Sequence, residues 1–200
     1  MHLVSINTAR VTPLFVNGSS GGPQTVMTGS RKQPVNDGDG VKINRLGLAG
    51  DEQADLTVHG GLDKAVYAYP IEHYSFWQQE GERIFKQIKP LAMGALGENL
   101  TTQGLLETAL WVGDRLQIGE VLLEVTEPRA PCYKFAACMG YKSAVKQMLQ
   151  SGFTGVYLRV IETGVISARQ AIQLIPGVRE VSIAQINGQR LRGRQRDLFL

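Results

Sequence analysis

Short apolar runs alternate with clusters of Gly, Asn and Asp along most of the chain. This pattern predicts a domain rich in β-strands and tight turns, because Gly, Asn and Asp accept the backbone angles that turns require. The clearest hairpin joins residues 115–118 to residues 121–126 across Gly119 and Glu120. In its second arm every other position is apolar, so one face of that strand should be buried and the other partly wet.

Weaker signals extend the β pattern to both sides of this hairpin. A second hairpin is expected from residues 155–161 to residues 165–166, across Glu162, Thr163 and Gly164. The Asp-Gly pairs at residues 36–40 predict a strong turn, from which the chain should return as a strand. The further strands expected on these grounds span residues 3–6, 24–27, 41–46, 65–69 and 171–175.

Two segments have the apolar spacing of short helices. One spans residues 71–79, after Pro70 has ended the preceding strand. The other spans residues 143–149, with Ser143 as its cap and Gly152 as its stop. The helices are few and short, so the chain is predicted to be mainly β.

Length and charge indicate one folded domain with a basic end. The chain has 200 residues, of which 43% are hydrophobic, and a formal net charge of +3. This length and hydrophobic content are sufficient for one domain with a single hydrophobic core. We assign residues 1–178 to the domain and residues 179–200 to a short basic C-terminal appendage. The appendage lacks the interleaved aromatic residues of nucleic-acid-binding segments apart from Phe199, which disfavours nucleic acid as a partner.

The chain also lacks the sequence features of membrane and secreted proteins. No segment approaches the ~18 apolar residues that a membrane span requires, and the N-terminus does not read as a signal peptide. Cys132 and Cys138 are the only cysteines, and their spacing matches neither a zinc pair nor a CxxC redox motif. We therefore expect a protein of the reducing cytoplasm, with no membrane partner.

Cys132 is the most prominent candidate for chemistry. It lies between Pro128 and Pro131 on one side and Lys134 on the other, at the end of an apolar strand, with Arg129 close by. Prolines fix the backbone, and neighbouring cations favour the thiolate, which is the form that serves as nucleophile or soft-metal ligand. A small core cysteine at a strand end is the alternative.

A glycine-rich segment offers a second candidate. Gly60 and Gly61 expose backbone N–H groups beside Lys64, so together they could hold a phosphate or another oxyanion. A plain Gly-Gly turn would have the same sequence. Arg31 and Lys32, which follow another Gly-rich loop, are further candidates for a phosphate contact.

Two more clusters are weaker on their own. Asp51, His59 and Asp63 have the ligand types of a metal site, although His59 could equally orient a loop through a hydrogen bond. Asn99, after Glu98, could hydrogen-bond both donors and acceptors of a heterocycle, or could belong to an ordinary turn. The chain contains no GxxxxGK[ST], GxGxxG or GxSxG motif, so the common nucleotide-binding and serine-hydrolase classes are not favoured.

Taken in order, these clusters resemble the motif blocks of a MOSC domain, and more narrowly of its YiiM-like subgroup. The resemblance covers residues 1 to about 175 and rests on four blocks, at residues 47–53, 59–66, 97–101 and 128–134. It implies a mainly β fold, a MOSC-type β-barrel related to the pyruvate-kinase β-barrel domain, with a few short helices. Relatives of this type carry a longer helical tail than residues 181–200. The resemblance is also compatible with a homodimer.

The resemblance also implies the molybdenum cofactor, a pterin dithiolene bearing a phosphate, with Cys132 as the protein ligand to the metal. Cations would then neutralise its phosphate or oxo groups, and glycine backbone and polar side chains would line the pocket. The residues implied for the first role are Lys64, Arg129 and Lys134, and those for the second are His59, Gly60, Gly61, Asp63, Glu98 and Asn99.

The function predicted from these residues is an oxidoreductase that reduces N-hydroxylated bases or related N-oxygenated compounds. Glu98, Asp63 or His59 would relay the proton. A separate reductase would supply electrons, because the chain has no flavin, haem or Fe–S motif. The first alternative is a non-catalytic module that carries the cofactor or a persulfide on Cys132. The second is a hydrolase or transferase with Cys132 as nucleophile and His59 as base.

Overall fold

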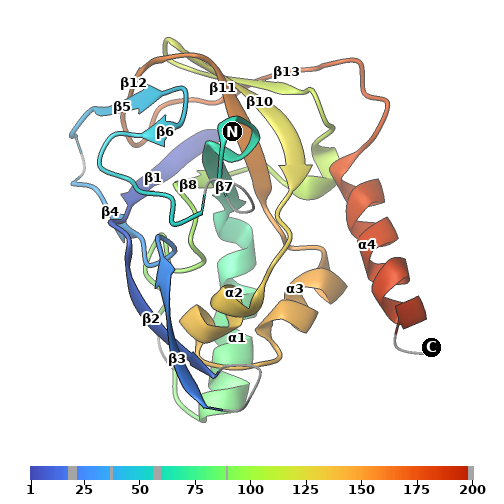
Figure 1. Ribbon diagram of the computed structural model, residues 1–200. Coiled ribbons are helices and arrows are strands. Elements are labelled where there is room, and N and C mark those ends of the chain that lie inside the picture. Colours follow the sequence, from blue (N-terminus) through green and yellow to red (C-terminus); the bar gives the residue numbers. More distant parts are fainter. Residues whose placement is uncertain (18–21, 37, 56–59, 89, 198–200) are drawn as a thin grey trace.

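The fold is built on one curled eight-stranded sheet, shown in the computed structural model of Figure 1. The structure describes residues 1–17, 22–36, 38–55, 60–88 and 90–197. Neighbouring strands of this sheet are antiparallel except β7 and β8, which run parallel. In sheet order the strands are β13 (Gln173–Ile175), β9 (Arg115–Ile118), β10 (Val121–Pro128), β11 (Val156–Glu162), β7 (Val66–Pro70), β8 (Leu100–Gln103), β1 (His2–Thr8) and β4 (Gln33–Pro34).

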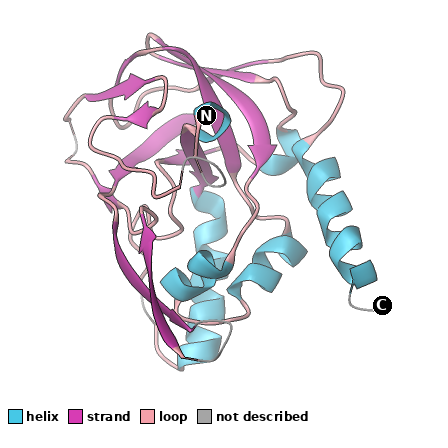
Figure 2. Cartoon of the chain, viewed as in Figure 1, coloured by secondary structure: helices cyan, strands magenta, loops and turns pink. Residues whose placement is uncertain are grey.

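Two small sheets and a group of helices complete the described part. Strands β2 (Thr12–Asn17) and β3 (Pro23–Thr28) form a hairpin, and β12 (Gly164–Ile166), β5 (Val41–Asn44) and β6 (Gly47–Leu48) form a three-stranded sheet. With the β2–β3 hairpin on the left, the helices lie below the large sheet and at its right side in the view of Figure 2. They are α1 (Tyr74–Phe85), α2 (Tyr133–Met139), α3 (Ala144–Ser151) and α4 (Ile183–Asp197), with 3₁₀ turns at Leu62–Lys64, Ile71–His73 and Glu107–Ala109.

Hydrophobic burial holds the sheet and the helices in two adjoining clusters. The larger is aliphatic and lies within the curl of the sheet, with Leu3, Leu100, Leu123 and Leu158 fully buried. The smaller is aromatic and lies between the sheet and helices α1 to α3. The edge of Trp77 packs against the ring of Phe135, with ring centroids 5.5 Å apart and an interplanar angle of 80°. This contact fixes α2, the helix that follows Cys132.

The structure confirms the mainly β prediction, the hairpin of β9 and β10, and the two predicted helices, which correspond to α1 and α3. Helix α3 ends at Gly152, as expected, although Ser143 makes no side-chain capping bond. Helix α2, helix α4 and strand β2 were not predicted. No described helix combines the length and the apolar character needed to cross a bilayer.

One predicted hairpin is wrong, and one predicted strand is too long. Residues 164–166 do form a strand, but β12 pairs with β5 and not with β11. Strand β11 pairs with β10 along residues 156–162 and with β7 at residues 156–158, whereas β12 lies in the small sheet beside β5. The strand after the turn at 36–40 ends at Asn44 rather than at Leu46, and it pairs with β6 and β12. The strand that precedes the turn, β4, pairs with β1.

Candidate functional site

A single cavity collects most of the predicted site residues. It lies where the segments after β3 and β6 meet β7 and the start of α2, so its walls come from parts of the chain far apart in sequence. Cys132, Arg129, Lys64 and Lys134 all line it, which confirms that the three cations converge on the thiol. The other lining residues are Thr28, Gly29, Ser30, Lys32, Asp51, Glu52, Gln53, Ala54, Asp55, Tyr67, Gly97, Asn99, Ala130 and Tyr157.

Strand β10 and helix α2 position the thiol. The strand ends at Pro128, and Cys132 precedes the first residue of α2 in an extended conformation, with φ −123° and ψ 179°. The backbone N–H of Phe135 donates to the Cys132 carbonyl at 3.0 Å. Cys132 is free and half-buried. A thiol held on a helix start and open to a cavity is placed to act as a ligand or nucleophile.

Arg129 supplies a buried positive charge beside the thiol. Its Nη1 donates to the Leu96 carbonyl at 2.5 Å, and its guanidinium lies over the rings of Tyr67 and Phe135, 4.8 and 5.0 Å from their centroids. Among the described residues, no carboxylate forms an ion pair with Arg129. A guanidinium stays charged at any physiological pH, so this cation is suited to balance an anion in the cavity.

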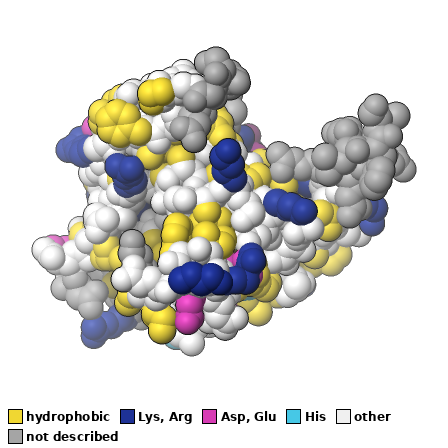
Figure 3. Space-filling view, turned by 90° about the horizontal axis from the view of Figure 1, so that it is seen from below, with side chains coloured by type: hydrophobic (Ala, Val, Ile, Leu, Met, Phe, Trp, Pro, Cys, Tyr) yellow, Lys and Arg dark blue, Asp and Glu magenta, His cyan; other side chains and the backbone are white. Residues whose placement is uncertain are grey.

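The other two predicted cations are more exposed. Lys64 lies 3.4 Å from Glu127 in a salt bridge, and its Nζ is 5.9 Å from the centre of the Tyr157 ring. Lys134 donates to the Met27 carbonyl at 3.0 Å. Positive charge also extends beyond the cavity: the face seen from below in Figure 3 shows Lys and Arg side chains around a hollow with hydrophobic side chains. Such a surface favours the approach of an anion.

Lys32 and Asp51 form an ion pair in the cavity wall that the sequence pattern did not indicate. Their charged atoms lie 2.5 Å apart, and the side chains are only 7% and 5% exposed. The Asp51 carboxylate also accepts hydrogen bonds from the Asn99 amide and the Ala9 backbone N–H, each at 2.8 Å. Asn99 therefore holds Asp51 in the wall. The sequence indicated Lys32 only as a possible phosphate contact. Its pairing with Asp51 was missed because Asp51 lies 19 residues away, in another loop.

Glu98 lies beneath the cavity and does not line it. The side chain is fully buried, and its Oε1 accepts hydrogen bonds from the Tyr74 hydroxyl and, at 2.9 Å each, from the Gly94 N–H and the Thr101 hydroxyl. Its Oε2 has no hydrogen-bond partner among the described residues. Burial raises the pKa of Glu98, since removal from water disfavours the carboxylate. The group is therefore placed to stabilise the fold in its protonated form.

This placement predicts a pH-dependent effect of Glu98→Gln. A raised pKa in the folded state stabilises the protein below the unfolded-state pKa, and that contribution is lost as pH rises through the folded-state pKa. Gln cannot titrate, so the variant does not share this loss. The unfolding free energy of the variant minus that of the wild type should therefore increase as pH rises, by about 1.4 kcal/mol per unit of pKa shift. Urea unfolding from pH 4 to pH 8 measures this, with exposed Glu82→Gln as control. Parallel pH profiles would contradict it.

The remaining predicted residues lie outside the cavity or outside the described part. Asp63 is paired with Arg159 at 2.7 Å, its side chain is 61% exposed, and it is not a lining residue. The Gly61 N–H donates to Gln53 at 3.0 Å, so the Gly60–Gly61 turn supports the wall from behind. His59 lies outside the described residues. The structure therefore brings together the cations, Asn99 and Cys132, but not Asp63 or Glu98.

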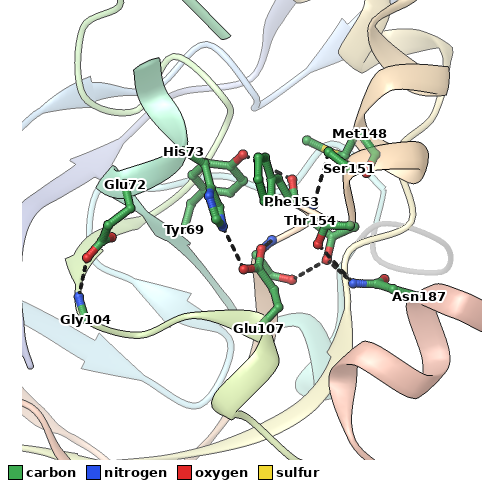
Figure 4. Close-up of polar contacts among 12 residues, drawn as sticks. Tyr69, Glu72, His73, Gly104, Glu107, Met148, Ser151, Phe153, Thr154 and Asn187 are labelled. Atoms are coloured by element: carbon green, nitrogen blue, oxygen red, sulfur yellow. Dashed lines mark hydrogen bonds and ion pairs between the residues drawn. The ribbon is translucent and has the colours of Figure 1, made fainter. Parts of the chain in front are cut away.

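Helix α4 is fastened to the segments that form the site. At its first half, the Asn187 amide donates to the Gly152 carbonyl at 3.1 Å and to the Thr154 hydroxyl at 3.0 Å (Figure 4). Further along, Arg190 donates to the Pro128 carbonyl at 2.7 Å and to Glu127 at 2.8 Å. Glu127 is also the partner of Lys64. Arg190 thus connects α4 both to the loop that carries Cys132 and to a cavity cation.

We expect Arg190→Ala to loosen this loop. Two charge-assisted hydrogen bonds are lost from a partly exposed site, so the unfolding free energy should fall by about 1 kcal/mol. Alkylation of Cys132 by iodoacetamide in the cofactor-free protein should also change in rate, because Pro128 and Lys64 lose their support. The control is Arg192→Ala, because Arg192 lies two residues further along α4 and its side chain is exposed. Identical stability and alkylation rates in both variants would show that Arg190 does not position the loop.

Comparison with known proteins agrees with this geometry. A family model described as the MOSC domain matches residues 55–173. The uncharacterized protein YflK of Bacillus subtilis is 39% identical over 186 residues, covering 92% of this chain and 78% of YflK. The crystal structure of YiiM from Geobacillus stearothermophilus superposes with a TM-score of 0.73 and 31% identity, covering 96% of this chain and 85% of that one.

The chain therefore belongs to the MOSC family and is YiiM-like, with the fold that this family membership predicts. A third relative is much longer than this chain. A protein of Gibberella moniliformis named "Reductase" is 35% identical over 136 residues, which cover 68% of this chain but only 24% of that protein. The matched region is thus a minor part of a much longer chain there.

Proposed function

We propose that this protein is a molybdenum-cofactor-dependent reductase of N-hydroxylated bases or related N-oxygenated compounds. The observation that carries the proposal is the cavity in which the Cys132 thiol lies among Arg129, Lys64 and Lys134. Thiolate is a soft ligand that suits a metal of this kind, and cations suit an anionic cofactor. MOSC membership and the fungal relative named "Reductase" support the same assignment.

The residues present fit the chemistry of the cofactor. The group is a dithiolene with a phosphate, so it needs one protein ligand and compensation for several negative charges. Cys132 would provide the ligand. Arg129 would provide charge without competition, since its described contacts are a carbonyl and two aromatic rings. Lys64 and Lys134, at the more exposed part of the wall, would meet the phosphate or oxo groups, and Asn99 would stay bonded to Asp51.

When bound, the cofactor would supply the two-electron chemistry that cleaves an N–O bond. The chain's own residues would bind the substrate, limit access of water and provide protons. Neither Glu98 nor Asp63 lines the cavity, so neither is placed for direct proton transfer to a substrate there. Electrons would come from a separate reductase. The two free cysteines suit a reducing cytoplasm.

The test is reduction of 6-hydroxylaminopurine by protein purified from a strain that makes the cofactor, with reduced methyl viologen as electron donor. We expect amine formation by this protein and none by protein from a strain unable to make the cofactor. Bound molybdenum without amine formation would favour the carrier module instead. Turnover and covalent labelling at Cys132 in molybdenum-free protein would favour the hydrolase or transferase.

A further inference from the structure

The ion pair of Lys32 and Asp51 is the feature of the cavity that the cofactor does not explain. A lysine placed only to bind an anion would be expected at the accessible part of the wall, as Lys64 and Lys134 are. Lys32 is instead 7% exposed, and its charge is already matched by Asp51 at 2.5 Å. Asp51 is in turn held by Asn99 and by the backbone of Ala9. A paired, buried ammonium that still lines a cavity is a candidate for proton transfer.

The surroundings favour the release of a proton from this amine. Burial lowers the pKa of Lys32, and the charge of Arg129 acts in the same direction. Asp51 opposes the shift, as does Glu98 to the extent that it is ionised, but burial prevails. These are the charged groups that face Lys32. A lysine with a lowered pKa is a better acid than an exposed lysine near neutral pH.

We infer that Lys32 donates the proton to the oxygen that leaves the N-hydroxylated substrate, while Asp51 orients the amine. This inference rests on the proposed function. The reaction is R–NHOH + 2 e⁻ + 2 H⁺ → R–NH₂ + H₂O, in which the N–O bond breaks and the nitrogen is reduced. The electrons come from the separate reductase. One proton comes from Lys32 and the other from solvent, after which the Lys32 amine takes a proton back from water.

The other polar groups at the cavity are less suited to this step. Arg129 cannot lose its proton under physiological conditions. Lys64 is paired with Glu127 at a more exposed position, and Lys134 is only half-buried and donates to the Met27 carbonyl. Cys132 is assigned to the metal. Among the described lysines and arginines that line the cavity, Lys32 is therefore the buried one that combines a transferable proton with a fixed orientation.

The decisive variant is Lys32→Arg, which keeps the positive charge but cannot release a proton. We expect molybdenum content and KM within about twofold of wild type, and a kcat lower by about 100-fold or more, as is usual for the loss of a general acid. Lys32→Ala should lose kcat in the same way and recover part of it when ethylammonium is added to the assay. Exposed Lys42→Met is the matched control and should behave as wild type.

A second readout does not depend on the loaded enzyme. In cofactor-free protein labelled with ¹³C at lysine Cε, one resonance should titrate at lower pH than the other lysines, and it should vanish in Lys32→Arg. Wild-type kcat in Lys32→Arg would overturn the inference, since charge alone would then suffice. Loss of molybdenum from Lys32→Arg would overturn it as well, by assigning Lys32 to cofactor binding. If wild-type protein fails to reduce the hydroxylamine while the ¹³C resonance still titrates low, the proposed function is what fails, and the proton-transfer role falls with it.

Discussion

Cys132→Ser is expected to lose all molybdenum-dependent reduction of 6-hydroxylaminopurine while the fold is unchanged. A serine hydroxyl has nearly the size of the thiol but is a poor ligand for a soft metal. The side chain is half-buried at the cavity and makes no side-chain capping bond at the start of α2, so its exchange removes no capping hydrogen bond. Amine formation with methyl viologen as donor and thermal unfolding of the same preparations measure the two properties.

The matched control is Cys138→Ser. Cys138 lies one turn and a half further along the same helix, is also free and half-buried, and does not line the cavity. Burial raises the pKa of its thiol, which disfavours the reactive thiolate. Its replacement should leave the reduction rate near that of wild type. If Cys138→Ser lost activity and Cys132→Ser kept it, the assignment of the ligand would be wrong.

Arg129→Met should lose both stability and cofactor. The substitution leaves the Leu96 carbonyl without its donor in a buried place, which costs about 1–3 kcal/mol of unfolding free energy. It also removes the buried cation that no described carboxylate neutralises, so molybdenum retention should fall sharply. Urea unfolding and metal analysis test the two effects separately, with exposed Arg45→Met as control. Full stability and full molybdenum content in Arg129→Met would refute the role given to this residue.

The sequence alone predicted the residues of the candidate site better than it predicted which strands pair with each other. Cys132 and its cations could be predicted because they are close in sequence and lie at the end of a strongly patterned strand, β10. Lys64 joins them from another segment, and its position followed from the family resemblance. The pairing of β12 with β5 could not be predicted, because it joins segments far apart in sequence and no local pattern indicates it.

The parts that were missed depend on contacts between distant segments. Helix α2 has seven residues, too few to be stable alone, and it forms because Phe135 is buried against Trp77 and Gly140 ends it with a positive φ of 81°. The pairing of Lys32 with Asp51 likewise leaves no local pattern. Glu98 was expected at the pocket because it belongs to one of the motif blocks of the family resemblance, but its side chain points to Tyr74 and Thr101, beneath the cavity.

The most direct test of the account is molybdenum content per protein chain after purification from a strain that makes the cofactor. Wild-type protein and Cys138→Ser should carry stoichiometric molybdenum together with the pterin, whereas Cys132→Ser should carry almost none. All three should unfold at the same temperature once the cofactor has been removed. A wild-type protein without molybdenum, or a Cys132→Ser protein that holds as much as wild type, would contradict the assignment of this cavity to a molybdenum centre bound by Cys132.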